Sequence, residues 1–304
     1  MPALSNNKVI RLIFFGNYFY GLCAVALSIE ASLQQRFPLN GALFYLLLFS
    51  ITVVYYSKAY VQTETPADDG NLRSLWYARN RIFVRNTQII FTALAFFCLA
   101  VFLTQGYHFI FSLYSYEWLL IFSFPLVSAL YYGIGIGGKY NLRNVGWLKP
   151  FLIGFTWAGL VNIYPVIYYN ILHGQHYQFT LFGVLLFIKN FMYVTVLCIM
   201  FDIKDYVMDY NQHVKTFVVN VGLRKTIFLI IIPLTVLGLI SFLTFAFLQH
   251  FHSLKIALNT VPFLLILTVA YSLQTRKSIF YYLAIIDGLM LVKALCGSVA
   301  MIYF

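Results

Sequence analysis

Three aspartates cluster in one short stretch of the chain and are the strongest candidates for chemistry. Asp202, Asp205 and Asp209 are three of nine acidic residues among 304, and they follow a long apolar run. The spacing i, i+3, i+7 predicts that all three carboxylates lie on one face of a helix, spread over roughly 10 Å. Carboxylates at the end of an apolar helix cost free energy unless a cation neutralises them. Mg²⁺ takes such oxygen ligands and often bridges a carboxylate to a substrate phosphate.

Basic side chains lie near the three aspartates in the sequence. They suit the oxygens of a diphosphate, because lysine acts as a point charge and arginine as a fork of donors. These residues are Lys204, Lys215, Arg224 and Lys225. The alternative interpretation is a solvated helix end with mixed charge, which is the commoner role of such a run.

The composition indicates a membrane protein. Hydrophobic residues make up 62% of the chain and charged residues only 10%. The apolar runs, at about 20 residues each, are long enough to span a bilayer. The net charge of +11 does not predict nucleic-acid binding, because the Lys and Arg residues are dispersed between apolar runs and form no basic face.

Nine apolar runs can be counted, and each predicts one membrane-spanning helix. They cover approximately residues 9–31, 41–60, 87–105, 116–136, 148–170, 180–201, 226–249, 254–273 and 279–304. We therefore expect an all-α, polytopic membrane protein, with residues 1–304 forming a single transmembrane domain of nine helices.

Lys and Arg residues are concentrated in every second loop between the apolar runs, and therefore on one predicted side of the membrane. Sixteen Lys and Arg residues lie at the N-terminus and around the loops that follow the second, fourth, sixth and eighth runs. The opposite segments hold only Arg36 and Lys255. Because cytoplasmic loops carry the excess of Lys and Arg, this pattern predicts a cytoplasmic N-terminus and an extracytoplasmic C-terminus. The three aspartates are then cytoplasmic.

The aspartate stretch resembles the second aspartate-rich motif of the UbiA superfamily of intramembrane prenyltransferases. That motif reads D-x-x-D-x-x-x-D, then a small-residue turn, then T-L-P-V-x-x-G. The aspartate spacing is kept here, and so is the spacing from Thr216 to Gly222. The departures are His213 at the turn glycine and Phe217-Val218 at the Leu-Pro pair. Nine helices with the motifs on the cytoplasmic side is also the UbiA plan.

The resemblance implies transfer of an isoprenyl group from a prenyl diphosphate to an apolar acceptor, with Mg²⁺ as cofactor. The three aspartates would be the catalytic residues, as ligands for Mg²⁺ on the diphosphate. Arg73, Lys204 and Lys215 are the predicted diphosphate-binding residues. The metal and the basic side chains would stabilise charge on the leaving diphosphate. The family also carries a lysine near the segment after the fourth run, where Lys139 and Lys149 are candidates.

The resemblance is incomplete where a UbiA enzyme carries its first motif, N-D-x-x-D-x-x-x-D. Aligning the motif's asparagine with Tyr56 places Ser57, Tyr60 and Glu64 at the aspartate positions. Only Glu64 keeps a carboxylate there, so Glu64 is the one further predicted metal ligand. Because this side offers fewer carboxylates, we expect one tightly held Mg²⁺ on the side of residues 202–209.

Three ionisable residues lie inside apolar runs. We expect Lys189 and Lys293 near the outer membrane surface, where their ammonium groups can snorkel. Asp287 is nearer the middle of its run, so it is expected to line a cavity or to pair with a polar residue. The candidate partners are Asn162, Asn190 and Asn259.

Two other functions remain open. The first is a UbiA-like protein that binds a prenyl lipid without turnover, since its first motif is eroded. The second is an unrelated cation-coupled transporter that uses the three aspartates as a cation or proton site. Mg²⁺-dependent binding of a prenyl diphosphate separates the transporter from the other two, and product formation separates the enzyme from the binder.

Overall fold

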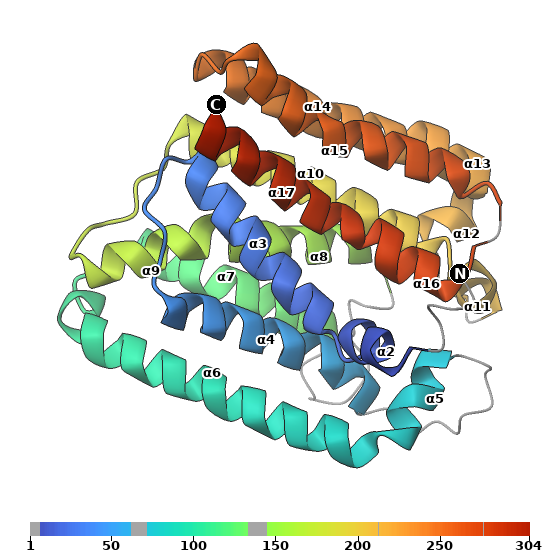
Figure 1. Cartoon of the computed structure of the whole chain (residues 1–304), viewed down its shortest axis with the longest axis horizontal. Coiled ribbons are helices and arrows are strands. Elements are labelled where there is room, and N and C mark those ends of the chain that lie inside the picture. The colour runs from blue at the N-terminus through green and yellow to red at the C-terminus, as the bar shows by residue number, and fades with distance from the viewer. Residues whose placement is uncertain (1–6, 62–71, 133–144, 212, 276) are drawn as a thin grey trace.

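The computed structural model describes residues 7–61, 72–132, 145–211, 213–275 and 277–304, which form helices with no strand among them (Figure 1). The helices of the first half are α2 (Lys8–Phe15), α3 (Tyr18–Gln34), α4 (Ala42–Val61), α5 (Leu72–Arg79), α6 (Arg81–Ile110), α7 (Ser115–Tyr132), α8 (Lys149–Ala158) and α9 (Tyr164–Leu172). Those of the second half are α10 (Leu181–Asp202), α11 (Tyr206–Asn211), α12 (Phe217–Val221), α13 (Leu223–Lys225), α14 (Ile232–Leu248), α15 (Ser253–Ser272), α16 (Ile279–Tyr281) and α17 (Gly288–Tyr303). Short π-helical segments join three pairs of these helices into continuous rods, namely η3 (Gly159–Ile163), η4 (Thr226–Ile231) and η5 (Tyr282–Ile286).

Six of the described helical segments are long and apolar enough to cross a membrane. They are Arg81–Ile110, Lys149–Leu172, Leu181–Asp202, Leu223–Leu248, Ser253–Ser272 and Ile279–Tyr303. The bent pair α2 and α3 raises this number to seven if it counts as one span. The prediction of an all-helical integral membrane protein is therefore confirmed, whereas the count of nine spans stays a prediction.

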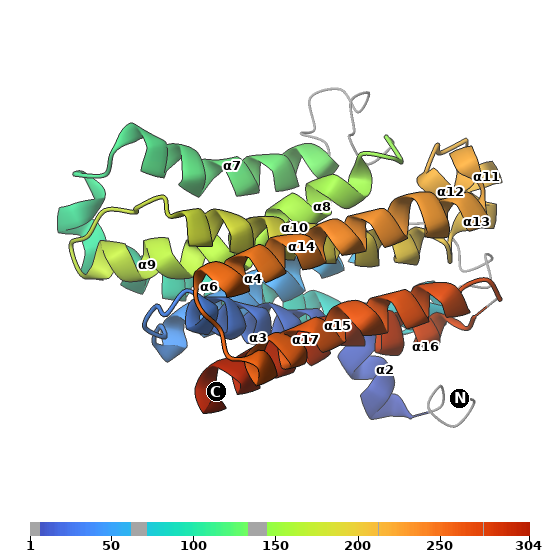
Figure 2. The ribbon, with the colours of Figure 1, turned by 90° about the horizontal axis from the view of Figure 1, so that it is seen from above.

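The long helices form one bundle (Figures 1 and 2). Helix α10 packs between α8 and α14, and α17 packs between α3 and α15. Helix α4 packs against both α3 and α6. The short helices α5, α11, α12 and α13 gather at the end of the bundle where α10 stops, whereas α17 ends at the opposite end (Figure 1). This gathering end is where the aspartates lie.

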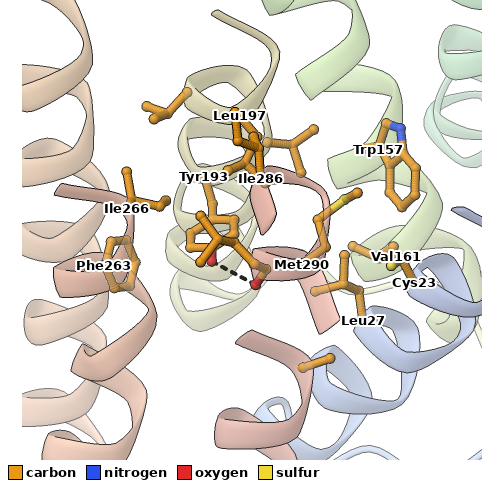
Figure 3. Close-up of a cluster of buried hydrophobic side chains, with 14 of the residues drawn as sticks. Cys23, Leu27, Trp157, Val161, Tyr193, Leu197, Phe263, Ile266, Ile286 and Met290 are labelled. Carbon is orange, nitrogen blue, oxygen red and sulfur yellow. Dashed lines mark hydrogen bonds between the residues drawn. The ribbon is translucent and has the colours of Figure 1, made fainter. Parts of the chain in front are cut away.

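A buried core of large apolar side chains holds α10 and α17 together with α3, α8 and α15 (Figure 3). Tyr193 of α10 is almost fully buried there, and its ring meets that of Phe263 edge-on. Its hydroxyl donates a hydrogen bond to the carbonyl oxygen of Leu289 at 2.8 Å. Because a buried hydroxyl costs free energy without a partner, this bond locks the rotation of α10 against the first turn of α17.

The bend between α2 and α3 is centred on Asn17. The two helices meet at 60°, and Asn17 takes a left-handed backbone conformation with φ 64°. Asparagine tolerates this conformation because its short polar side chain can hydrogen-bond locally. The Asn17 amide donates to the hydroxyls of Ser57 at 2.9 Å and Tyr77 at 3.0 Å, and its oxygen accepts from Arg73. The bend therefore ties α3 to α4 and α5.

Two lysines in the bundle interior share one glutamate. Glu30 of α3 accepts from Lys189 of α10 at 3.1 Å and from Lys293 of α17 at 2.6 Å. The side chains of all three residues are at most 3% exposed. Gln34 bridges Glu30 and Asn259, and it also accepts from Lys189.

The expectation that Lys189 and Lys293 snorkel to the outer surface is therefore wrong. A carboxylate on the neighbouring helix α3 satisfies both ammonium groups inside the bundle, so neither needs to reach water. We call these five residues the Glu30 cluster: Glu30, Gln34, Lys189, Asn259 and Lys293.

Candidate functional site

The three aspartates lie on two helices and the turn between them, rather than on one helix. Helix α10 ends at Asp202, and α11 begins at Tyr206. The Asp205 N–H donates to the carbonyl oxygen of Asp202 at 3.1 Å, a tight-turn bond that does not continue the α-helix. Asp209 lies within α11. The prediction of one shared helical face was wrong, because this turn interrupts the helix between the first and the third carboxylate.

Asp202 forms an ion pair with Lys149, the first residue of α8. Their side-chain atoms, Nζ and Oδ1, are 2.6 Å apart. Two glycines allow this approach. A Cβ on Gly154 would lie 2.2 Å from the Thr195 hydroxyl of α10, and one on Gly146 would lie 2.6 Å from the backbone of Lys215. Because no larger side chain fits at either point, α8 can pack closely against α10, and the segment before α8 against the backbone at Lys215.

A cavity of about 220 Å³ opens beside this ion pair. We call it the polar cavity, and its polar lining includes Tyr20, Arg73, Lys149, Asp202, Asp205 and Asp287. Lys204 also lines it, and its ammonium lies 3.1 Å from the Asp205 carboxylate and 4.8 Å from the centre of the Phe201 ring. Helices that are distant in sequence, α3, α4, α5, α8, α10 and α17, thus contribute to the lining of one cavity.

A larger cavity of about 570 Å³ adjoins the polar cavity. We call it the apolar chamber, and it lies among Ile51, Phe124, Pro125, Trp157, Leu160 and Tyr164. Tyr55, Tyr56, Ile153 and Trp157 line both cavities. At this shared wall the Trp157 indole N–H donates to the Tyr56 hydroxyl at 2.6 Å. A ligand with a charged head and an apolar tail would find matching surroundings on the two sides of this wall.

Two buried carboxylate oxygens near the polar cavity have no hydrogen-bond partner among the described residues. They are Oδ2 of Asp202 and Oδ2 of Asp209. Burial, opposed by the positive charge of Lys149 and reinforced by Asp202 and Asp205, raises the pKa of Asp209 to about 6. Unpartnered carboxylate oxygens are the donors that a hard divalent cation prefers, so the donor chemistry here fits Mg²⁺.

The described parts of the chain contain no group of three or more His, Cys, Asp or Glu side chains placed to hold a metal ion together. Asp202 and Asp205 line the polar cavity, but Asp209 is not among the residues that line it. The three predicted ligands are therefore neighbours that do not converge on one point in this arrangement.

The positions aligned with the eroded first motif hold hydroxyl and aromatic side chains. Tyr56 accepts from Trp157, and Ser57 accepts from Asn17. The Tyr60 ring stacks on Tyr77 and lies 4.4 Å from the Arg73 guanidinium. Tyr60 directly, and Ser57 through Asn17, hold Arg73 in the cavity wall.

Only some of the other predicted diphosphate-binding and metal-binding residues line the polar cavity. Arg73 and Lys204 both line the polar cavity. Lys215 is exposed and is not among the residues that line the cavity, so its role stays a prediction. Glu64 lies outside the described residues.

The sequence did not identify the partners of two further residues of the polar cavity, Lys149 and Asp287. Lys149 appeared only as one of several basic residues after the fourth run, yet it is the partner of Asp202. Asp287 lines the polar cavity, as expected, and it accepts from the Tyr20 hydroxyl at 2.6 Å rather than from one of the three candidate asparagines. Asn162 and Asn190 instead bond to each other at 2.8 Å. The one signal in the sequence was a carboxylate inside an apolar run.

Comparisons with known proteins give a likeness of fold. No family model and no curated protein matches the sequence. A solved structure described as a digeranylgeranylglyceryl phosphate synthase in membranes superposes with a TM-score of 0.56. The two sequences are 13% identical, and the superposition covers 98% of this chain and 99% of that chain. The arrangement of helices is therefore similar along nearly the whole chain.

Proposed function

We propose that this chain is a UbiA-like membrane prenyltransferase, which transfers an isoprenyl group from a prenyl diphosphate to an apolar acceptor. The observation that carries the proposal is the polar cavity, with its carboxylates and cations, adjoining the larger apolar chamber. The fold likeness to a digeranylgeranylglyceryl phosphate synthase supports it. So does the aspartate spacing at Asp202, Asp205 and Asp209.

In this proposal the diphosphate occupies the polar cavity and the prenyl chain occupies the apolar chamber. Arg73, Lys149 and Lys204 give the diphosphate three cationic partners in the cavity wall. Charged hydrogen bonds of this kind stabilise the negative charge of the departing diphosphate. Arg73 is next to Tyr60, one of the positions aligned with the first motif of the family.

Asp202, Asp205 and Asp209 would hold a single Mg²⁺, with Glu64 as a secondary ligand. When bound, Mg²⁺ neutralises charge on the diphosphate and so favours its departure. The unpartnered oxygens of Asp202 and Asp209 are the available donors. Lys149 pairs with the other oxygen of Asp202, which leaves Oδ2 as the oxygen that would face the metal.

The aromatic groups at the shared wall are suited to stabilise the positive charge that develops on the prenyl group. The allylic carbon gains positive charge as the diphosphate leaves. The faces of Tyr56 and Trp157 can stabilise such a cation through their negative quadrupoles. Both side chains line the polar cavity and the apolar chamber, so the reacting carbon would lie between them.

The orientation is part of the proposal: nine spans in one domain, with the N-terminus cytoplasmic. The separation of Lys and Arg between alternate segments supports it. A reporter fused after Phe304 should give an extracytoplasmic signal, and a cytoplasmic signal would mean that a span has been miscounted.

A two-part experiment tests the function. Purified protein is first titrated with farnesyl and geranylgeranyl diphosphate, with and without Mg²⁺. It is then incubated with each donor and a membrane extract, and the products are identified by mass spectrometry. Prenylated product is expected only with Mg²⁺. Binding without product would support a non-catalytic prenyl-lipid-binding protein, and a lack of Mg²⁺-dependent binding would contradict the site.

A further inference from the structure

Asp287 is the carboxylate in the polar cavity that has no lysine or arginine as ion-pair partner among the described residues. Asp202 pairs with Lys149 and Asp205 pairs with Lys204. Asp287 is 5% exposed and lines the cavity from the start of α17. A buried carboxylate is costly when it has no charged partner, so its presence here calls for a role.

The Tyr20 hydroxyl holds the Asp287 carboxylate. It donates to Oδ2 at 2.6 Å. The Tyr20 ring stacks on the Tyr56 ring, with centroids 4.5 Å apart and planes 14° apart. Tyr56 in turn accepts from Trp157. Because Tyr56 and Trp157 form part of the wall shared with the apolar chamber, Asp287 is linked through two rings to the place proposed for the reacting carbon.

The backbone around Asp287 is also fixed. Its N–H donates to the Tyr282 carbonyl at 3.1 Å, and its own carbonyl accepts from Met290 at 3.1 Å. The neighbouring Leu289 carbonyl accepts from Tyr193 of α10. The carboxylate therefore projects from a rigid helix start rather than from a loop, which is what a proton acceptor at a defined distance requires.

Prenyl transfer releases one proton. The C–O bond of the donor breaks, and its electron pair leaves with the diphosphate. A new bond forms between the allylic carbon and the attacking atom of the acceptor. That atom, the oxygen of a hydroxyl or a ring carbon of a phenol, then loses its proton. A carboxylate without a cationic partner is a better proton acceptor than one whose charge a lysine already neutralises.

We propose that Asp287, positioned by Tyr20, is the base that takes the proton from the acceptor. This inference rests on the proposed function. It assigns Asp287 to the acceptor and leaves Asp202, Asp205 and Asp209 to the metal and the donor. Asp287 is then a catalytic residue and Tyr20 a positioning residue.

The experiment compares Asp287→Asn, Tyr20→Phe and wild type in two measurements. The first is Mg²⁺-dependent binding of geranylgeranyl thiolodiphosphate, an unreactive donor analogue. The second is the rate of transfer from geranylgeranyl diphosphate to a phenolic acid or a monoalkylglyceryl phosphate, whichever wild type accepts. Thermal unfolding in detergent shows how much of each preparation is folded.

Asp287→Asn should keep analogue binding within about threefold of wild type, and it should lower the transfer rate by about 10²-fold or more, the usual worth of a general base. Donor turnover to prenyl alcohol and diphosphate should continue in this variant, because departure of the diphosphate does not need the base. Tyr20→Phe should lower kcat by about tenfold with little change in the donor KM, since it loses only one positioning hydrogen bond.

Glu117→Gln is the matched control. Glu117 is a buried carboxylate of α7 that lies outside both cavities and bonds to His176 at 2.9 Å. This variant should keep the transfer rate per folded molecule.

Three results would overturn the inference. In one, Asp287→Asn transfers within threefold of wild type. In another, it loses analogue binding as strongly as transfer, which would place Asp287 with the donor. In the third, wild type neither binds the analogue nor forms product, so that the proposed function itself fails and the inference fails with it.

Discussion

The bundle contains two clusters of lysines and carboxylates that differ in how completely their charges are enclosed. In the Glu30 cluster, the side chains of Lys189, Lys293 and Glu30 are 2%, 3% and 0% exposed, and both carboxylate oxygens accept from an ammonium group. In the polar cavity, the Lys149 side chain is 25% exposed, and Asp202 keeps one buried oxygen without a partner among the described residues.

The Glu30 cluster has the features of a structural set of ion pairs, whereas the ion pairs of the polar cavity are accessible to a ligand. The Glu30 cluster joins α3, α10, α15 and α17 and is sealed by packing, so a ligand cannot reach it without separating helices. The polar cavity has space, an unpartnered oxygen and cations that line an open wall. We infer that incomplete pairing beside a cavity, rather than burial of charge alone, marks the site.

The largest expected effect comes from breaking the sealed cluster. Glu30→Gln keeps the shape of the side chain but leaves Lys189 and Lys293 as buried charges without an anion. Removing one member of a buried ion pair costs about 3–5 kcal/mol, so the unfolding temperature in detergent should fall sharply. The control replaces Glu30, Lys189 and Lys293 together by methionine, which should recover most of the loss. An unchanged unfolding temperature in Glu30→Gln would contradict the comparison.

The same kind of change in the polar cavity should leave the fold intact. Asp202→Asn removes the partner of Lys149, but that lysine is partly exposed and can turn to solvent. We expect little change in unfolding temperature and a weakening of Mg²⁺-dependent prenyl diphosphate binding by about tenfold or more, the worth of a charge-assisted contact. Calorimetric titration measures the affinity, and a thermal melt of the same preparation measures the unfolding temperature. If Asp202→Asn lowers the unfolding temperature as much as Glu30→Gln does, the two clusters contribute equally to stability and the comparison fails.

A smaller effect is expected on the side of the eroded first motif. Glu64→Ala should weaken Mg²⁺-dependent binding less than Asp205→Ala does, because Glu64 is the one carboxylate among the aligned positions, whereas Asp202, Asp205 and Asp209 are all retained. Titration of Mg²⁺ at a fixed concentration of prenyl diphosphate measures both variants. Equal damage from the two changes would restore a two-sided metal site with a rearranged first motif.

The smallest expected effect is a dependence on pH. The pKa of Asp209 is raised to about 6, so protons compete with Mg²⁺ for this carboxylate below that value. Apparent Mg²⁺ affinity should rise between pH 5 and pH 7, and Asp209→Asn should flatten the rise. Without metal, folding stability should change in the opposite direction to Mg²⁺ affinity. The folded state favours the protonated carboxyl of Asp209, so the free energy of unfolding falls as the pH rises through about 6. A rise of equal size in Asp209→Asn would assign the proton to another group.

The sequence was sufficient to predict the class of fold and the neighbourhood of the site. A bilayer offers no hydrogen bonds to the backbone, so long apolar runs must form helices, whatever their tertiary contacts. This is why the all-helical membrane fold follows from composition and run length. Arg73, Lys204, Asp202 and Asp205 were candidates near the ends of such runs, and all four line the polar cavity. Their roles stay predictions.

Only the tertiary structure decided which charged side chains meet. Tyr20 and Asp287 are 267 residues apart, and Glu30 and Lys293 are 263 residues apart. These pairings depend on how each helix is rotated about its axis, and an apolar run carries little information about that rotation because most of its faces are hydrophobic. The turn after Asp202 was equally hidden, since the i, i+3, i+7 spacing fits an uninterrupted helix. The sequence by itself therefore determined the helices and the end of the bundle where the aspartates lie. Packing determined that Lys189 and Lys293 are enclosed and that Asp287 faces the cavity.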